Sequence, residues 1–175
     1  MSTIVLFRGK AGTGKSTLSM ELAKRMNVVV LHKDDIYDSV AEYVSDHGAR
    51  NKICFEFLYK FLQHVLASNS AVMLDFGLNN ADDVMKLRSW IVERNGELKV
   101  IHCMCSDDSM WSERLSQRSG NPRPNQLITD LTQLKAHYKA IHNEFIENEL
   151  VIDTVRDIEF SIERILSFLN GETAS

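Results

Sequence analysis

The chain has 175 residues, a length typical of one domain with a full apolar core. Its composition, 44% hydrophobic and 25% charged, excludes bulk disorder, and 24 acidic against 20 basic residues give a net charge of −4. That balance excludes a strongly basic protein that binds nucleic acid through its charge. The three cysteines argue against a disulfide framework, and the apolar runs are too short for a signal peptide or a membrane span. We therefore expect a cytoplasmic protein with no membrane partner.

Short apolar runs alternate along the chain with longer segments of helical spacing. The predicted strands are Thr3–Arg8, Val28–His32, Ala71–Asp75, Leu98–Cys105 and Leu150–Thr154. The predicted helices are Lys15–Met26, two within Ile36–Ala67 with a polar break at Asp46–Asn51, Ala81–Arg94, Asp107–Arg118, Leu127–Asn148 and Ile158–Leu169. Strands rich in Val, Ile and Leu that are separated by helices indicate βαβ units and a parallel sheet covered on both faces. The predicted fold class is α/β, with a five-stranded sheet in one domain over residues 1–175.

The segment between the first strand and the first helix matches the phosphate-binding pattern G-x-x-x-x-G-K-[ST] at every specified position. Its glycines let the backbone wrap an anion with the amides pointing inward, and the helix N-terminus that follows favours phosphate. Lys15 can reach the β- and γ-phosphates of a nucleotide, and the Ser16 hydroxyl can bind Mg²⁺. The predicted nucleotide-binding residues are Gly9, Lys10, Ala11, Gly12, Thr13, Gly14, Lys15, Ser16 and Thr17. ATP and Mg²⁺ are therefore the expected ligands.

Other short motifs narrow the class of nucleotide-binding protein. Asn51-Lys52-Ile53-Cys54 lacks the Asp of the guanine-reading motif, which argues against a GTPase. Asp75 is followed by Phe76 and not by the Glu that ATPases use to activate water. Asp75-Phe76-Gly77 matches the metal motif of protein kinases, but the sequence has no H-R-D motif to accompany it. Because these motifs argue against the other classes, the sequence favours a small phosphotransferase.

Four pieces of the chain together resemble the P-loop kinases of the AAA_33 and zeta-toxin-like group. They are the phosphate loop, His32-Lys33-Asp34-Asp35-Ile36, Trp111-x-x-Arg114-x-x-x-Arg118 before a proline-bearing loop, and Val151-Ile152-Asp153-Thr154. The chain is also similar to chloramphenicol phosphotransferase and gluconate kinase. The resemblance implies a three-layer P-loop NTPase fold with strand order 2-3-1-4-5. It also implies a small lid at about residues 118–128 that closes over ATP.

The resemblance assigns roles to two carboxylates. In the similar kinases, an acid after the second strand accepts the proton of the hydroxyl that is phosphorylated. Neighbours on an extended segment point in opposite directions, so only one of Asp34 and Asp35 should face the site. Asp34 fits the family pattern better. Alternatively, both acids cap the next helix. Asp75 would hold a Mg²⁺-bound water together with Ser16 in the manner of a Walker B acid, or would serve as a helix cap.

Three arginines are assigned to the nucleotide in the same way. Arg114 and Arg118 share one helix face, and Arg123 lies between two prolines of the predicted lid. The resemblance implies that Arg118 and Arg123 neutralise charge on the transferred phosphoryl group, and that Arg114 and Arg118 contact the nucleotide near adenine. The alternative is a solvated helix face. His32 ends a predicted strand near the site, whereas His47, His64, His102, His137 and His142 follow no ligand spacing. Each histidine is interpreted as a surface or core residue, and the acids after Asn143 as solvated helix faces.

The acceptor pocket is expected within Ile36–Ala67, with Tyr37, Asp38, Tyr43, His47, Arg50 and Asn79 as polar candidates. The Pro-Arg of adenylate kinases and the glycine triplet of shikimate kinases are missing after Asp75, which argues against their acceptors. We therefore predict an ATP-dependent kinase that phosphorylates a hydroxyl of a small molecule. Two alternatives stay open: a kinase acting on a polynucleotide 5′-hydroxyl or a nucleotide sugar, and an ATP-binding module without catalysis.

Overall fold

The computed structural model describes residues 1–119, 123–124, 126, 128–139, 141 and 145–171. The strands are β1 (Ser2–Arg8), β2 (Val30–His32), β3 (Ala71–Asp75), β4 (Gly96–Met104) and β5 (Glu149–Asp153). The helices are α1 (Lys15–Met26), α2 (Lys33–Val40), α3 (His47–Ala67), α4 (Ala81–Val92), α5 (Asp108–Ser119), α6 (Leu131–Tyr138) and α7 (Ile158–Leu169). Among the helices of these residues, none combines the length and hydrophobicity that a membrane span requires.

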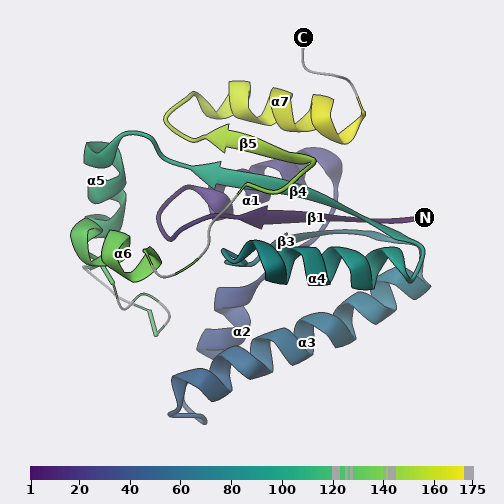
Figure 1. Ribbon diagram of the computed structural model, residues 1–175, viewed down its shortest axis with the longest axis horizontal. Coiled ribbons are helices and arrows are strands. Elements are labelled where there is room, and N and C mark those ends of the chain that lie inside the picture. The colour runs from purple at the N-terminus through teal and green to yellow at the C-terminus, as the bar shows by residue number, and fades with distance from the viewer. Residues whose placement is uncertain (120–122, 125, 127, 140, 142–144, 172–175) are drawn as a thin grey trace.

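The five strands form one parallel sheet in the order β2-β3-β1-β4-β5, which confirms the predicted fold and strand order. The arrowheads of the strands point toward the end of the molecule where α5 and α6 lie (Figure 1). His32 is in register with Asp75, and Asp75 with Phe7, so β2, β3 and β1 end side by side. This edge, formed by the carboxyl ends of the strands, is where ligands bind in open α/β sheets.

Alternate residues of the strands face opposite sides of the sheet and form two separate cores. On one side, Ile4 and Leu6 of β1 pack with buried residues of α3 and α4. On the other side, Val5 and Phe7 pack with buried residues of α1 and α7. Because β1 is buried on both faces, its residues Ile4–Phe7 form an uninterrupted apolar run, as expected for the central strand of a three-layer fold.

Two predicted helix boundaries are wrong, and in each case an aspartate cap explains the observed one. The break predicted at Asp46–Asn51 ends earlier, since the Asp46 side chain accepts a hydrogen bond from the Ala49 amide at 2.7 Å and starts α3 at His47. The helix predicted over Leu127–Asn148 is the much shorter α6. Asp130 caps its start by accepting from Gln133, and it ends at Tyr138; residues 140 and 142–144 of the predicted helix lie outside the described part of the chain.

The end of α4 also differs from the prediction of a helix that runs to Arg94. The helix ends at Val92, and Asn95 takes the left-handed conformation with φ of 57°. Gly96 begins β4, where a β-carbon would collide with Leu66 and lie 2.8 Å from the Ile91 side chain. Asn95 therefore makes the turn, and Gly96 allows the close approach of α3 and α4 to the sheet.

A buried ion pair joins the central strand to the far strand of the sheet. The Arg8 guanidinium donates to the Glu149 carboxylate at 3.0 Å, and their side chains are 0% and 2% exposed. His102 of β4 contacts the same carboxylate at 3.1 Å, and Arg8 also donates to the carbonyl of Asn79 at 3.2 Å. The interpretation of every acid after Asn143 as a solvated helix face is therefore wrong for Glu149, which lies in a strand and is a buried structural partner.

Candidate active site

The phosphate loop connects the end of β1 to the start of α1, as predicted. Gly9 has φ of 135°, and a β-carbon there would collide with the carbonyl oxygen of Cys103. Gly14, with φ of 86°, is the N-cap of α1 and has no side chain to cap the helix. The first amides of α1 thus keep their capacity to bind an anion. The Lys15 amine donates to the carbonyl of Lys10 at 2.9 Å, which holds it over the loop.

Two aromatic residues from other helices hold the outer side of this loop. The indole N–H of Trp111, on α5, donates to the carbonyl of Ala11 at 2.8 Å. The Ala11 amide donates to the hydroxyl of Tyr138, on α6, at 3.3 Å. The Lys10 amine lies 6.0 and 5.7 Å from the ring centroids of Trp111 and Tyr138, within cation–π range. The phosphate loop is therefore positioned by α5 and α6 as well as by its own glycines.

The two predicted metal-binding residues lie together. The Ser16 hydroxyl donates to Asp75 Oδ2 at 2.5 Å, and His32 Nδ1 lies 3.0 Å from the same oxygen. Burial alone would raise the pKa of Asp75, but the His32 hydrogen bond, the Lys15 charge and the Ser16 hydrogen bond together lower it below its usual value. The hydrogen bond to Asp75 in turn raises the pKa of His32. This small cluster joins a carboxylate whose pKa is lowered to a hydroxyl and an imidazole.

Asp34 and Asp35 belong to the first turn of α2 and not to an extended segment, so the predicted reason why only one of them faces the site is wrong. The two side chains nevertheless have different surroundings. Asp34 is half-buried and lines the central cavity, whereas Asp35 is exposed. Burial, and then the negative charge of Asp75, raise the pKa of Asp34. The helix N-cap is His32, so neither acid is the cap residue.

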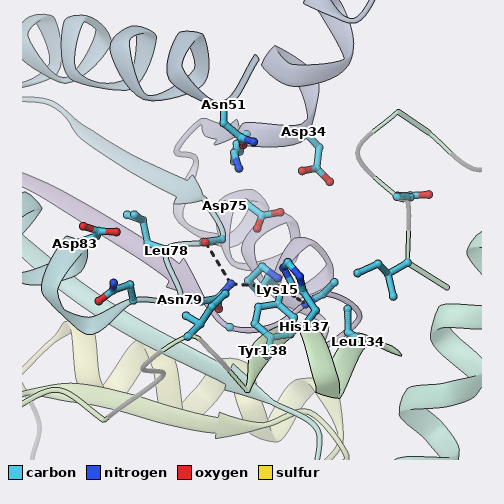
Figure 2. Close-up of a pocket in the computed structure, with 18 of the residues that line it drawn as sticks. Lys15, Asp34, Asn51, Asp75, Leu78, Asn79, Asp83, Leu134, His137 and Tyr138 are labelled. Carbon is cyan, nitrogen blue, oxygen red and sulfur yellow. Dashed lines mark hydrogen bonds between the residues drawn. The ribbon is translucent and has the colours of Figure 1, made fainter. Parts of the chain in front are cut away.

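The central cavity has a volume of about 680 Å³ and extends from the phosphate loop to α3 and α6 (Figure 2). Its lining includes Lys15, Ser16, Asp34 and Asp75. A second cavity of about 500 Å³ lies on the other side of the loop and is lined by Gly12, Gly14, Thr17, Arg114 and Thr154, among others. Residues of the phosphate loop thus line both cavities.

The three predicted arginines are placed differently. Arg114 lines the second cavity and donates to the hydroxyl and the carbonyl oxygen of Thr154 at 2.8 and 2.9 Å. Arg118 belongs to α5, but its side chain lies outside the described part of the structure. Arg123 is exposed and does not line either cavity. Of the predicted lid, residues 120–122, 125 and 127 are also outside the described part.

The predicted acceptor residues are only partly brought together. His47 and Asn79 line the central cavity. Tyr37 is fully buried and hydrogen-bonded to His47, whereas Tyr43 is 85% exposed and Arg50 binds backbone carbonyls of the α2–α3 connection. Asp38 is half-buried, four residues after Asp34 on α2, and does not line the cavity.

The cavity also contains residues that the sequence analysis missed. Polar examples are Lys33, Asn51, Asp83, His137 and Tyr138. Tyr138 and His137 could not be found by spacing, because α6 approaches the loop only through the tertiary fold. His32 does not line the cavity, but it ends β2 beside Asp75, in agreement with its predicted place at a strand end near the site. Its contact with Asp75 was not predicted.

The phosphate loop, the strand order and the Ser16–Asp75 pair define the fold as that of a P-loop NTPase. The chain belongs to the AAA_33 family, described as an AAA domain, whose model matches residues 4–140. No curated protein sequence matches the chain.

Solved structures share this architecture over nearly the whole chain. A sugar kinase from Janibacter sp. HTCC2649 is 19% identical with a TM-score of 0.69, covering 97% of this chain and 95% of that one. A gluconokinase from Sinorhizobium meliloti is 15% identical with a TM-score of 0.65, covering 97% and 92%. An APS kinase from Mycobacterium tuberculosis, in complex with AMPPNP and APS, is 14% identical with a TM-score of 0.67, covering 97% and 98%. At these identities the likeness establishes the fold.

Proposed function

We propose that this protein is an ATP- and Mg²⁺-dependent kinase that transfers the γ-phosphoryl group of ATP to a hydroxyl of a small molecule. The observation that carries the proposal is a single cavity lined both by Lys15 and Ser16 of the phosphate loop and by the carboxyl of Asp34. The space beyond the loop is large enough for a metabolite. The folds shared with a sugar kinase, a gluconokinase and an APS kinase support the same reaction class.

The phosphate loop binds the phosphate groups of ATP in the proposed reaction. Its inward amides and the Lys15 amine bind the β- and γ-phosphate oxygens and offset their charge. Ser16 and Asp75 are suited to Mg²⁺, which binds through one or two protein oxygens and otherwise keeps water and phosphate ligands. When bound, Mg²⁺ would neutralise part of the negative charge of the phosphate oxygens. His32 keeps Asp75 oriented toward Ser16.

Asp34 is the proposed base that acts on the acceptor hydroxyl. In the transfer, the acceptor oxygen forms a new bond to the γ-phosphorus, while the bond from that phosphorus to the bridging oxygen breaks and leaves ADP with its electron pair. The proton of the acceptor hydroxyl passes to the Asp34 carboxylate. The raised pKa of Asp34 suits it to this role, because a base works best when its pKa approaches the operating pH.

The second cavity and the predicted lid also have roles in the proposed reaction. Arg114, beside Thr154 in the second cavity, contacts the nucleotide, and the adenosine occupies that cavity. Arg118 and Arg123 remain proposed to neutralise charge on the transferred phosphoryl group once the lid over residues 118–128 has closed. Closing the lid would also exclude water, which competes with the acceptor for the phosphoryl group.

The experiment is acceptor-dependent ADP release with MgATP and a panel of hydroxyl compounds, compared for the wild type, Asp34→Asn and Asp35→Asn. We expect Asp34→Asn to lower kcat by roughly 10²- to 10⁴-fold, the range for loss of a positioned base. Asp35→Asn is the matched control, because this neighbour is exposed, and it should keep the wild-type rate. Equal turnover by Asp34→Asn and the wild type would refute the base assignment. ATP binding without turnover on any acceptor would favour a binding module.

A further inference from the structure

The side chain of Asn79, which follows β3, has a buried hydrogen-bond acceptor at the wall of the central cavity. The residue is 9% exposed and lines the cavity. Its amide nitrogen donates to the carbonyl of Gly77 at 3.3 Å and to the hydroxyl of Tyr138 at 3.5 Å (Figure 2). Its amide oxygen Oδ1 is buried and has no hydrogen-bond partner among the described residues.

This orientation of the amide is set by its neighbours. Exchanging the nitrogen and oxygen would place Oδ1 against the Gly77 carbonyl oxygen, so that two acceptors would face each other. Buried acceptors in proteins are nearly always hydrogen-bonded. A buried, unpartnered carbonyl oxygen at a cavity wall therefore marks a place where a ligand's O–H or N–H group is expected to donate.

The charges of the cavity favour a ligand without negative charge. Beyond the Ser16–Asp75 pair, two carboxylates line it, those of Asp34 and Asp83. The Lys33 amine lies 5.5 Å from the Phe55 ring centroid, and its charge interacts with Asp34. The Asp83 carboxylate also contacts the Lys86 amine at 3.2 Å, but this pair is exposed and interacts weakly. An anionic group bound beside either carboxylate would meet a like charge, and repulsion between like charges discriminates strongly between ligands.

The remaining walls combine apolar and amide groups. Phe55, Leu78 and Leu134 supply apolar surface, and Asn51 and Asn79 supply amides. Such a lining suits a ligand that presents C–H surface on one side and hydroxyl groups on the other. Asn79 is also joined through the Tyr138 hydroxyl to the Ala11 amide, so this part of the cavity wall is connected to the phosphate loop.

On the basis of the proposed kinase function, we infer that the phosphoryl acceptor is a polyhydroxylated compound without negative charge, one of whose hydroxyls donates to Oδ1 of Asn79. Asn79 is a specificity-determining residue, and Asp83 with Asp34 excludes carboxylate- and phosphate-bearing acceptors. The acceptor class comprises neutral sugars and polyols, together with their amino derivatives.

The test is a panel of compounds that share one carbon skeleton and differ in charge: glucose, sorbitol, glucosamine, gluconate and glucose 6-phosphate, together with shorter and longer homologues of each. Binding of MgATP is first measured by calorimetry, so that loss of the nucleotide function is recognised separately. We expect kcat/KM for uncharged or amino members to exceed that of their anionic counterparts by at least about tenfold. Preference for the anionic members, or failure of every member while MgATP binds, would overturn the acceptor class and leave the nucleotide assignment intact.

A matched pair of variants separates the charge effect from folding. Asp83→Asn and Asp82→Asn change neighbouring acids in the first turn of α4, but only Asp83 lines the central cavity. We expect Asp83→Asn to reduce the preference for uncharged over anionic acceptors by at least roughly threefold, whereas Asp82→Asn keeps it. An unchanged preference in Asp83→Asn would refute the role of this carboxylate.

The variant Asn79→Leu tests the hydrogen bond, because leucine has nearly the same shape and offers no acceptor atom. KM for the uncharged acceptor should rise by at least about tenfold, while the dissociation constant of MgATP stays near the wild-type value. Retained ATP binding shows that the variant is folded. An unchanged acceptor KM in a variant that still binds ATP would show that Asn79 does not contact the acceptor.

Discussion

Asp34 and Asp75 are two carboxylates of one cavity whose surroundings separate their protonation behaviour. Asp75 lies next to His32, Lys15 and Ser16, which hold its pKa below the usual range. Asp34 is desolvated and faces the charge of Asp75, and both effects raise its pKa. When two neighbouring acids have different surroundings, their pKa values differ, and each acid can take a different chemical role. Asp75 is therefore suited to bind a cation, and Asp34 is suited to accept a proton.

This separation predicts the acidic limb of the pH–rate profile. Because the base must be deprotonated, kcat/KM should rise with pH as Asp34 loses its proton. The raised pKa places this rise above the pH at which an exposed aspartate titrates. The measurement is kcat/KM from about pH 4 to about pH 8 for the wild type and for Asp35→Asn, which should share one limb. A flat profile, or a limb that persists unchanged in the residual activity of Asp34→Asn, would contradict the assignment.

At the scale of elements, three strands of the sheet are tied together by Arg8 at the end of β1, His102 of β4 and Glu149 at the start of β5. The ion pair is almost fully enclosed. Although burial raises the pKa of Glu149, the His102 hydrogen bond and the Arg8 charge outweigh it and lower that pKa below its usual value. The Arg8 side chain also reaches the carbonyl of Asn79, so the same cluster supports the wall of the central cavity.

Removing the carboxylate should destabilise the protein. Glu149→Gln leaves a buried guanidinium without its counter-charge, and the free energy of unfolding should fall by about 3 kcal/mol or more. Glu147→Gln, an exposed neighbour, is the control and should change it little. Urea unfolding near neutral pH measures both. A loss for Glu149→Gln as small as that of the control would show that the pair contributes no stability.

The same carboxylate predicts how stability depends on pH. Its folded-state pKa is lower than its unfolded-state pKa, so its contribution is complete above the ordinary glutamate pKa and is lost as pH falls through the folded value. In Glu149→Gln this part of the acid destabilisation should be absent. Urea unfolding of both proteins at several acidic pH values gives the two slopes, and identical slopes would contradict the prediction.

Local sequence signals predicted most of the elements and the phosphate loop, but not the contacts that depend on tertiary structure. The strands were predictable because β-branched runs alternate with helical spacing, and the loop because its residues are contiguous. Glu149 was misjudged because nothing in its local sequence reveals that Arg8, 141 residues away, lies beside it. The long predicted helix failed because apolar spacing continues past Tyr138 although α6 ends there. The roles of Asn79 and Tyr138 likewise required the fold.

At the scale of the whole molecule, the phosphate loop lies between two cavities, one lined by Asp34 and the other by Arg114. In the proposed function, the acceptor binds in the first of these cavities and the nucleoside in the second. The helices α5 and α6, which flank the predicted lid in the sequence, contact the loop through Trp111 and Tyr138.

The most direct test of this account is calorimetric titration of MgATP into the wild type, Lys15→Met and Lys24→Met. The wild type should bind, and Lys15→Met should bind about 10- to 150-fold more weakly, the range expected when one charge-assisted hydrogen bond is lost. Lys24 lies on α1 with an exposed side chain, so Lys24→Met should bind as the wild type does. No binding heat with the folded wild type, or equal affinity in Lys15→Met, would contradict the assignment of this loop to a nucleoside triphosphate and the chemistry proposed for it.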